Sequence, residues 1–326
     1  MLIFSLGIIL IGAEAFTNGI EWLGKRLKLG AGAVGSIFAA VGTALPETMV
    51  PIMAILGGVG PEGADIGIGA ILGAPFMLAT VAFFITGFAA LLFRRKNLPL
   101  RLDAKVVSHD LKFFLIVYSI AILASFLPTE NFKNGAALFL VAAYVIYVYQ
   151  TLRDCKDDCK HESLAPLYME RRTSSPTMTM ILAQITLALV AIVFGADRFV
   201  NAVEPIAVDL GIPVFVLSLI ITPIATELPE KFNSVLWIRK GKDTLAMGNL
   251  TGAMVFQSSV IPAIGIALTP WKLDSLALWS ALLALGAATI SYLSLRRKGA
   301  ILPTTLMIGG AFYLLFIVTI VRFSNQ

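Results

Sequence analysis

A short element containing Thr, Pro and Glu occurs twice inside apolar sequence and limits how this chain can fold. The copies are Gly42-Thr43-Ala44-Leu45-Pro46-Glu47 and Ala225-Thr226-Glu227-Leu228-Pro229-Glu230. A carboxylate inside a membrane costs about 3 kcal/mol on insertion scales. A proline in a helix frees the carbonyl four residues earlier, here that of Gly42 or Ala225. Because a freed carbonyl in lipid needs another partner, a cation bound by this carbonyl, the Thr hydroxyl and the Glu carboxylate would satisfy all three groups.

The sequences around the two elements are copies of one another. Residues 12–47 align without a gap with residues 195–230, at an offset of 183, and eleven of the 36 positions are identical. In the first copy the identical residues are Gly12, Ala13, Phe16, Asn18, Glu21, Leu27, Ile37, Thr43, Leu45, Pro46 and Glu47. The chain is therefore predicted to contain two related halves, each with one Thr-x-Leu-Pro-Glu element.

The composition predicts an all-α polytopic membrane protein rather than a soluble domain. Hydrophobic residues make up 58% of the 326 positions, charged residues only 14%, and the mean hydropathy is +0.87. Apolar stretches of roughly 20 residues are long enough to cross about 30 Å of hydrocarbon. We expect ten transmembrane helices, at 2–22, 30–57, 65–92, 109–127, 134–152, 178–203, 212–238, 244–268, 274–295 and 300–321.

The first of these spans contains Glu14 and lacks a basic n-region, so we expect a transmembrane helix there rather than a cleaved signal peptide. We expect Asp65 and Asp243 to cap the helices that they open.

The charge pattern predicts how the two halves are inserted. Basic residues cluster after the first, third, fifth, seventh and ninth expected helices. The positive-inside rule places these loops in the cytoplasm and both termini outside, in a cell membrane. These loops account for the net charge of +5, so no nucleic-acid partner is implied. We expect a first repeat at 1–152, a cytoplasmic linker at 153–177 and a second repeat at 178–326. Five helices per repeat is an odd number, so the repeats are inverted, a common plan of secondary transporters with broken helices.

At these residues the chain resembles the calcium/cation antiporter superfamily, whose best-known branch is the sodium/calcium exchangers. Both repeats of that family carry a Gly-Thr-Ser-Leu-Pro-Glu element and, on the next helix, a Gly-Asn-x-x-Gly-Ser-Asn-x-x-Asn/Asp element. The first element corresponds here to 42–47 and 225–230. The second corresponds to the stretches Gly69 to Pro75 and Gly248 to Met254.

The resemblance implies a central site for Ca²⁺, a hard cation that takes six to eight oxygen ligands. Glu47 and Glu230 would be its two carboxylate ligands, and Thr43 and Thr226 would add carbonyl or hydroxyl oxygens. The other candidate site residues are Gly42, Ala225, Glu227, Asn249 and Gln257. The implied activity is secondary active antiport by alternating access, with Ca²⁺ exchanged for Na⁺ and no cofactor.

Several positions depart from the family pattern. The family's Ser after Thr is Ala44 in one repeat and Glu227 in the other, and its Ser on the next helix is Ala74 or Ala253. The distal Asn/Asp position becomes Leu78, after a four-residue insertion, and Gln257. These family positions help to bind Na⁺, so their loss keeps a calcium/proton exchanger, or a carrier of another divalent ion, as the alternative. Because adjacent carboxylates need not both ionise, Glu227 and Glu230 could carry a proton.

The sequence gives less support to two other functions, a passive channel and an enzyme. A passive cation channel is conceivable because Gly57, Gly58 and Gly60 would allow a pore-like loop. An enzyme is not expected, because the sequence contains neither His-Glu-x-x-His nor Gly-x-Ser-x-Gly. Cys155, Cys159 and His161 offer too few ligands for a zinc site, so we expect a solvated loop there.

Overall fold

The computed structural model describes residues 1–26, 45–57, 60–94, 98–154, 165–171, 173, 175–211 and 213–324; at some helical positions, including 225, 226 and 228–233, it describes the backbone alone. These residues form helices and no strand. The helices are α1 (Leu2–Arg26), α4 (Leu45–Leu56), α5 (Gly60–Met77), the π-helix η2 (Leu78–Ala82), α6 (Phe83–Arg94), α7 (Ala104–Leu123), η3 (Ala124–Phe126), α8 (Glu130–Asp154), η4 (Tyr168–Glu170), α9 (Met178–Leu210), α10 (Val214–Arg239), α11 (Asp243–Leu268), α12 (Ser275–Lys298) and α13 (Pro303–Ser324).

Within the described residues, eight helices are long and apolar enough to cross a membrane. They correspond to eight of the predicted spans, so the prediction of an all-helical membrane protein is confirmed. The other two predicted spans are 30–57, which begins outside the described residues, and 212–238. Helix α4 covers the described end of the first region and α10 covers the second, but the apolar stretches whose side chains are described there, Glu47–Leu56 and Val214–Ile224, are shorter than a membrane span. The count of ten therefore stays a prediction.

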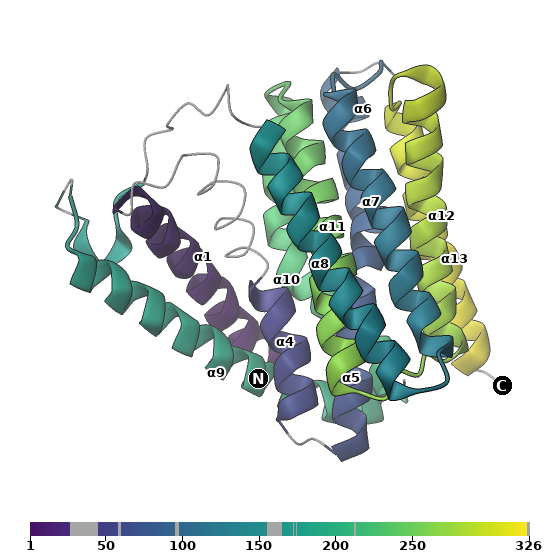
Figure 1. Ribbon diagram of the computed structural model, residues 1–326, viewed down its shortest axis with the longest axis horizontal. Helices are drawn as coiled ribbons and strands as arrows, with labels where there is room; N and C mark the ends of the chain where they lie inside the picture. Colours follow the sequence, from purple (N-terminus) through teal and green to yellow (C-terminus); the bar gives the residue numbers. More distant parts are fainter. Residues whose placement is uncertain are drawn as a thin grey trace.

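Helices α1 and α9 pack side by side and lie obliquely to the upright helices of the bundle (Figure 1). Their contact is reciprocal. A Cβ atom on Gly12 would lie 2.9 Å from Ile192 Cγ1 and 3.2 Å from the Ala188 carbonyl oxygen. A Cβ atom on Gly195 would lie 2.8 Å from Ile9 Cγ1 and 3.1 Å from the Ser5 carbonyl oxygen. Each residue of the first set lies 183 positions from its counterpart in the second, so this contact has the form of a local two-fold axis.

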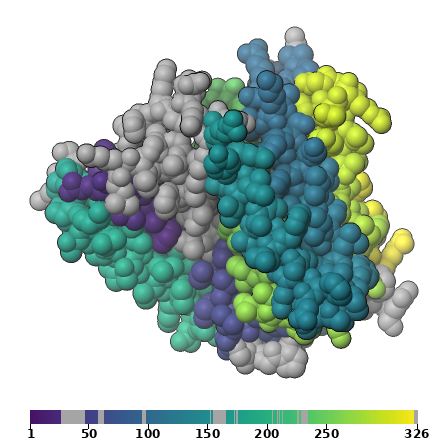
Figure 2. Space-filling model, viewed as in Figure 1, coloured from purple at the N-terminus to yellow at the C-terminus, as the bar shows by residue number. Residues whose placement is uncertain are grey.

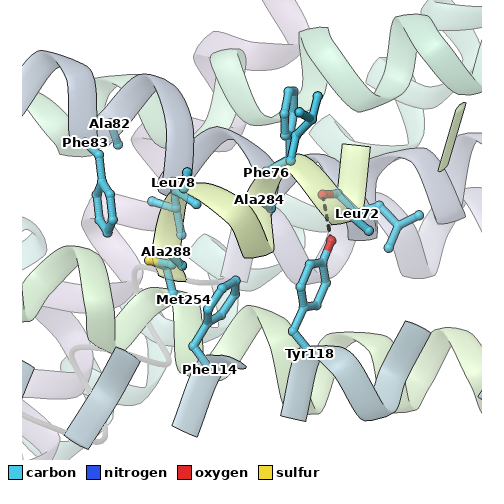
Figure 3. Close-up of a cluster of buried hydrophobic side chains, with 14 of the residues drawn as sticks. Leu72, Phe76, Leu78, Ala82, Phe83, Phe114, Tyr118, Met254, Ala284 and Ala288 are labelled. Atoms are coloured by element: carbon cyan, nitrogen blue, oxygen red, sulfur yellow. Dashed lines mark hydrogen bonds between the residues drawn. The ribbon is translucent and has the colours of Figure 1, made fainter. Parts of the chain in front are cut away.

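The largest apolar core lies where α5, η2, α6, α7, α11 and α12 meet (Figure 3). Phe76, Phe83, Phe114 and Tyr118 are almost fully buried in it. Although Tyr118 is buried, its hydroxyl donates to the Leu72 carbonyl oxygen at 3.5 Å. In space-filling view, α8 covers much of one face of the bundle (Figure 2). Its exposed side chains include Leu138, Phe139 and Val145, which suit contact with lipid.

Helix α5 approaches α10 closely because two glycines lie in the contact. A Cβ atom would lie 2.5 Å from the Phe215 carbonyl oxygen if added to Gly69, and 2.2 Å from the Leu219 carbonyl oxygen if added to Gly73. Both glycines belong to the second family element, and no larger residue fits there without separating the two helices. This close contact fixes the position of α10, which carries the second Thr-x-Leu-Pro-Glu element.

The described parts of the α6–α7, α10–α11 and α12–α13 connections, three of the loops expected in the cytoplasm, meet at one end of the bundle, the upper end in Figure 1, which we call the basic end. Asp243 forms an ion pair with Arg94 and accepts a hydrogen bond from the Arg101 amide at 2.7 Å. The Leu100 amide donates to the Ile301 carbonyl oxygen at 3.0 Å, which joins the α12–α13 connection to the same end. The prediction that Asp243 is an N-cap is wrong, because the N-cap is Lys242 and the carboxylate of Asp243 binds Arg94. Asp65 lies inside α5 rather than at its start, so that prediction is also wrong.

Part of the predicted linker packs against α1 and α9. Residues 165–170, the docking segment, bind Asn18 of α1 through the Pro166 carbonyl oxygen at 3.3 Å and the Tyr168 amide at 3.2 Å. Gln184 of α9 accepts from the Met169 amide at 3.0 Å and donates to Asn18 at 3.0 Å. The Tyr168 hydroxyl donates to Glu14 at 2.7 Å, and this bond raises the pKa of Tyr168. Cys155, Cys159 and His161 lie outside the described residues.

Candidate functional site

The first site element lies where α4 begins. Glu47 is in the first turn of α4, and only 5% of its surface is exposed. The amide groups of a first turn favour a negative charge, so this position stabilises a carboxylate that has been removed from water. Gly42 and Thr43 lie outside the described residues, so their roles stay predictions.

The second element lies in the middle of α10. Glu227 is fully buried, at 0% exposure. The helix is continuous from Val214 to Arg239, so α10 is not one of the broken helices that the inverted-repeat plan implied. The side chains of Ala225, Thr226 and Glu230 lie outside the description, although their backbone belongs to α10. Residues three apart are neighbours on one helix face, which places Glu230 beside Glu227.

Helix α11 contributes the remaining candidates. Gln257 is 2% exposed, and its Oε1 atom has no hydrogen-bond partner among the described residues. A buried amide oxygen in this situation can serve as a ligand to a cation. Asn249 lies two turns earlier on α11 and is half-buried. Ser258 and Ser259, which follow Gln257, are also buried, but both hydroxyls donate to the carbonyl oxygen of Val255 on their own helix.

These helices lie together in the molecule. Helix α4 contacts α5, α10 and α11, and α10 contacts both α5 and α11. Figure 1 shows α4 and α10 between the α1–α9 pair and the remaining upright helices. The structure therefore brings the helices of Glu47, Glu227 and Gln257 into contact. Within the described part of the chain, no three His, Cys, Asp or Glu side chains gather into one metal-binding group.

Sequence reasoning missed two buried hydroxyls on α10. The Ser218 hydroxyl donates to the Ile66 carbonyl oxygen of α5 at 2.7 Å and lies 3.3 Å from the Thr222 hydroxyl. Ser218, Thr222 and Thr226 are spaced four residues apart, so they share one face of α10. This spacing was the signal in the sequence, and it extends the polar face of the site helix by two turns.

Sequence reasoning also missed Asp110. This carboxylate lies in the second turn of α7 and is 4% exposed. An acid at the start of an apolar stretch was the available signal, but the hydroxyl groups that surround Asp110 come from other helices and are brought to it by the fold.

Buried carboxylates on contacting membrane helices are typical of ion transporters. The family profile described as sodium/calcium exchanger protein matches residues 1–153 and 180–324. The chain therefore belongs to the sodium/calcium exchanger protein family, and it is an integral membrane protein.

Individual relatives are distant but cover most of the chain. The putative antiporter CaxA of Alkalimonas amylolytica is 26% identical over 297 residues, which are 88% of this chain and 86% of CaxA. The crystal structure of the H⁺/Ca²⁺ exchanger CAX has a TM-score of 0.77 at 19% identity, covering 98% of this chain and 80% of that one. A structure of the sodium-calcium exchanger NCX_Mj has a TM-score of 0.58 at 18% identity, covering 98% of this chain and 99% of that one. At these identities the two structures support the fold alone.

Proposed function

We propose that this protein is a secondary active antiporter that moves Ca²⁺ across the membrane in exchange for a monovalent cation. The observation that carries the proposal is the burial of Glu47 and Glu227, at 5% and 0% exposure, on helices α4 and α10 that contact one another. Two buried acids from the two sequence halves provide the charge and the hard oxygen atoms that a divalent cation requires. We propose that Glu230, Thr43, Thr226, Gln257 and Asn249 complete the ligand set, with the Gly42 and Ala225 carbonyls.

Two features support an inverted-repeat arrangement with halves 1–152 and 178–326. The α1–α9 contact is reciprocal about Gly12 and Gly195. The family profile matches two segments and passes over residues 154–179 between them. In such an arrangement the ion site lies between the halves and is open to one side of the membrane at a time.

Alternating access follows if the site changes sides only when it holds a cation. Two buried carboxylates without a cation repel one another and have lost their hydration. The empty site is therefore costly, and the site changes sides only when Ca²⁺ or counter-ions neutralise it. We propose that α1 and α9 slide together across the remaining helices during this step, because their contact with each other is more extensive than their contacts with α4 and α10.

The described residues favour H⁺ as the counter-ion. Ala74 is buried and Ala253 is half-buried, and neither supplies the hydroxyl that the family pattern has at these positions. Leu78, at the distal first-repeat position, opens the π-helix η2 and is fully buried among apolar residues. Glu227 instead adds a third acid, one turn from Glu230, and a neighbouring pair of this kind can retain a proton. Na⁺ is the second candidate, because it is the counter-ion in the name of the family.

The test is Ca²⁺ uptake into proteoliposomes under an imposed pH gradient and, separately, an imposed Na⁺ gradient. We expect uptake to follow the pH gradient and to be abolished by Glu47→Gln. We expect Glu227→Gln to reduce proton-driven uptake strongly, because it removes one of the two buried carboxylates and, with it, the neighbouring acid pair that can retain a proton. Glu130→Gln is the matched control, because its side chain is 68% exposed and lies outside the site.

The outcomes separate the alternatives. Uptake that follows only the Na⁺ gradient would refute H⁺ coupling and retain the antiporter. Full transport by Glu47→Gln would refute the ion site. Currents that need no counter-ion would indicate a channel.

The orientation also belongs to this proposal. The basic end, with Arg94, Arg101 and Lys240, would face the cytoplasm, and both termini would lie outside, at the opposite end in Figure 1. Single cysteines at Ser275 and at Gly299 in cells should react with an impermeant reagent from opposite sides of the cell membrane. Labelling of both from outside would contradict this orientation.

A further inference from the structure

Asp110 of α7 is a buried carboxylate that the proposed ion site does not use. One oxygen accepts from the Tyr147 hydroxyl of α8 at 2.8 Å. The other lies 2.7 Å from the Thr251 hydroxyl of α11. Asp110 therefore joins three helices at one point, and one of them, α11, carries the candidate ligands Asn249 and Gln257. An ionisable residue inside a membrane span is in general a candidate functional group.

The hydrogen bonds at Asp110 can be satisfied in two protonation states. The Thr251 hydroxyl also lies 3.0 Å from the Met247 carbonyl oxygen. This hydroxyl has one proton, so it can donate to only one of its two neighbours. If Asp110 is ionised, Thr251 donates to the carboxylate. If Asp110 is protonated, its own O–H donates to Thr251, which then donates to Met247. A proton can therefore bind at Asp110 without leaving a buried group unsatisfied.

His109 lies between Asp110 and water. Its side chain is 44% exposed, and its Nδ1 atom lies 3.9 Å from Asp110 Oδ1. The ring stacks on Tyr147 with centroids 5.5 Å apart, and Nε2 lies 3.3 Å from Gln150 Oε1. Asp110 is six residues from the start of α7 at the basic end, which corresponds to about 9 Å along the helix. The imidazole therefore lies between that side and Asp110, at a distance somewhat longer than a hydrogen bond.

The surroundings of Asp110 contain few other charges. On α7 itself, Lys105 and Lys112 are exposed. On α8 the titratable neighbours are Tyr147 and, next to it, Tyr144. Helix α11 has no ionisable residue after Asp243, and the basic residues at the end of α12, 296–298, are exposed. His109 is therefore the titratable side chain that lies between Asp110 and water.

We propose that Asp110 is a second proton-binding site, supplied through His109 from the basic end, which sets how firmly α11 is held. Ionised Asp110 holds Thr251 and Tyr147 by charge-assisted hydrogen bonds, which are roughly twice as strong as neutral ones. Protonation weakens both bonds and loosens α11 from α7 and α8. The effect on Ca²⁺ affinity rests on the proposed function, since it acts through Asn249 and Gln257. Proton binding at Asp110 is independent of the proposed function.

The first experiment detects the proton directly. Infrared difference spectra of the full-length protein between high and low pH should contain a carbonyl band from a protonated buried acid. Asp110→Asn should remove that band, whereas Glu227→Gln should leave it. Asp110→Asn can accept from Tyr147 and donate to Thr251, so it retains both hydrogen bonds and resembles the protonated state. A spectrum unchanged by Asp110→Asn would overturn the proposal, whether or not the protein transports Ca²⁺.

The second experiment measures coupling as Ca²⁺ binding affinity against pH in detergent. We expect wild-type affinity to fall on acidification by at least about fivefold, the lower end of typical couplings between sites. At high pH, Asp110→Asn should bind Ca²⁺ as weakly as the acidified wild-type protein does. Any pH dependence that remains in this variant should come from the ion site. Thr251→Val removes the hydroxyl that accepts the hydrogen bond of protonated Asp110. This variant should keep the infrared band of Asp110 but lose the coupling between Asp110 and Ca²⁺ affinity. A full wild-type pH dependence in Asp110→Asn would refute the coupling. If no variant binds Ca²⁺ while the Asp110 band persists, the failure lies with the proposed function instead.

Discussion

The contact between α5 and α10 gives a prediction whose size follows from the structure. A Cβ atom at Gly73 would lie 2.2 Å from the Leu219 carbonyl oxygen and 2.9 Å from the Leu219 Cα atom. Real Cβ contacts essentially never fall below 3.0 Å, so Gly73→Ala requires the backbones to separate by at least 3.0 − 2.2 = 0.8 Å. The obstructing atoms are main chain, so no side chain can rotate to relieve the contact.

We expect Gly73→Ala to destabilise the protein by about 1–3 kcal/mol, the usual cost of overpacking. Because α10 carries Glu227, the displacement should also weaken Ca²⁺ binding. Gly69→Ala needs a separation of only 3.0 − 2.5 = 0.5 Å at the same contact. The 0.8 Å separation already accommodates Gly69→Ala, so the double variant should be little worse than Gly73→Ala alone.

The assay is thermal unfolding in detergent, followed by Ca²⁺ binding on the same samples. Gly135→Ala is the matched control, because no described atom lies within 4 Å of its added Cβ and Ala favours a helix over Gly. A Gly73→Ala protein as stable as Gly135→Ala, with unchanged Ca²⁺ binding, would refute the reasoning.

Two further predictions concern the basic end and the docking segment. Asn18→Ala removes the bonds to Pro166 and Tyr168, so limited proteolysis should cut residues 165–170 faster than in wild type; equal rates would contradict the role of Asn18. Asp243→Asn leaves Arg94 without its carboxylate partner, and breaking a buried pair costs about 3–5 kcal/mol. The loss should lie near the lower end, since Arg94 is 20% exposed, and an unchanged unfolding temperature would show that the pair is not stabilising.

Much of the fold followed from local sequence because a membrane span imposes a simple requirement. Apolar stretches must be helical when no water is present to bind their backbone groups, so the eight long helices matched the predicted spans. The family also followed from short motifs, since Thr, Pro and Glu inside an apolar stretch have few structural uses. The predicted caps failed for a different reason. An Asp at the start of a helix can cap it or bind a distant cation, and Asp243 is brought to Arg94 by tertiary packing.

The site could be predicted only in part. Glu47, Glu227 and Gln257 are buried as a membrane ion site requires, and sequence reasoning singled out all three. The inverted-repeat plan implied broken helices, but α10 continues through both Pro223 and Pro229. Neighbouring helices can satisfy the backbone groups that a proline frees, and α5, which packs against α10, comes from a distant part of the sequence.

Composition, span length and internal repetition are local properties, so they were enough to predict a helical membrane protein with two similar halves and paired acidic motifs. The folded molecule adds three contacts that the sequence did not predict: the reciprocal contact of Gly12 and Gly195, the binding of residues 165–170 to α1 and α9, and the link between Tyr147 and Thr251 through Asp110. These pairs lie far apart in the chain, and their hydrogen bonds and close approaches depend on how the helices cross, which no single stretch of sequence specifies.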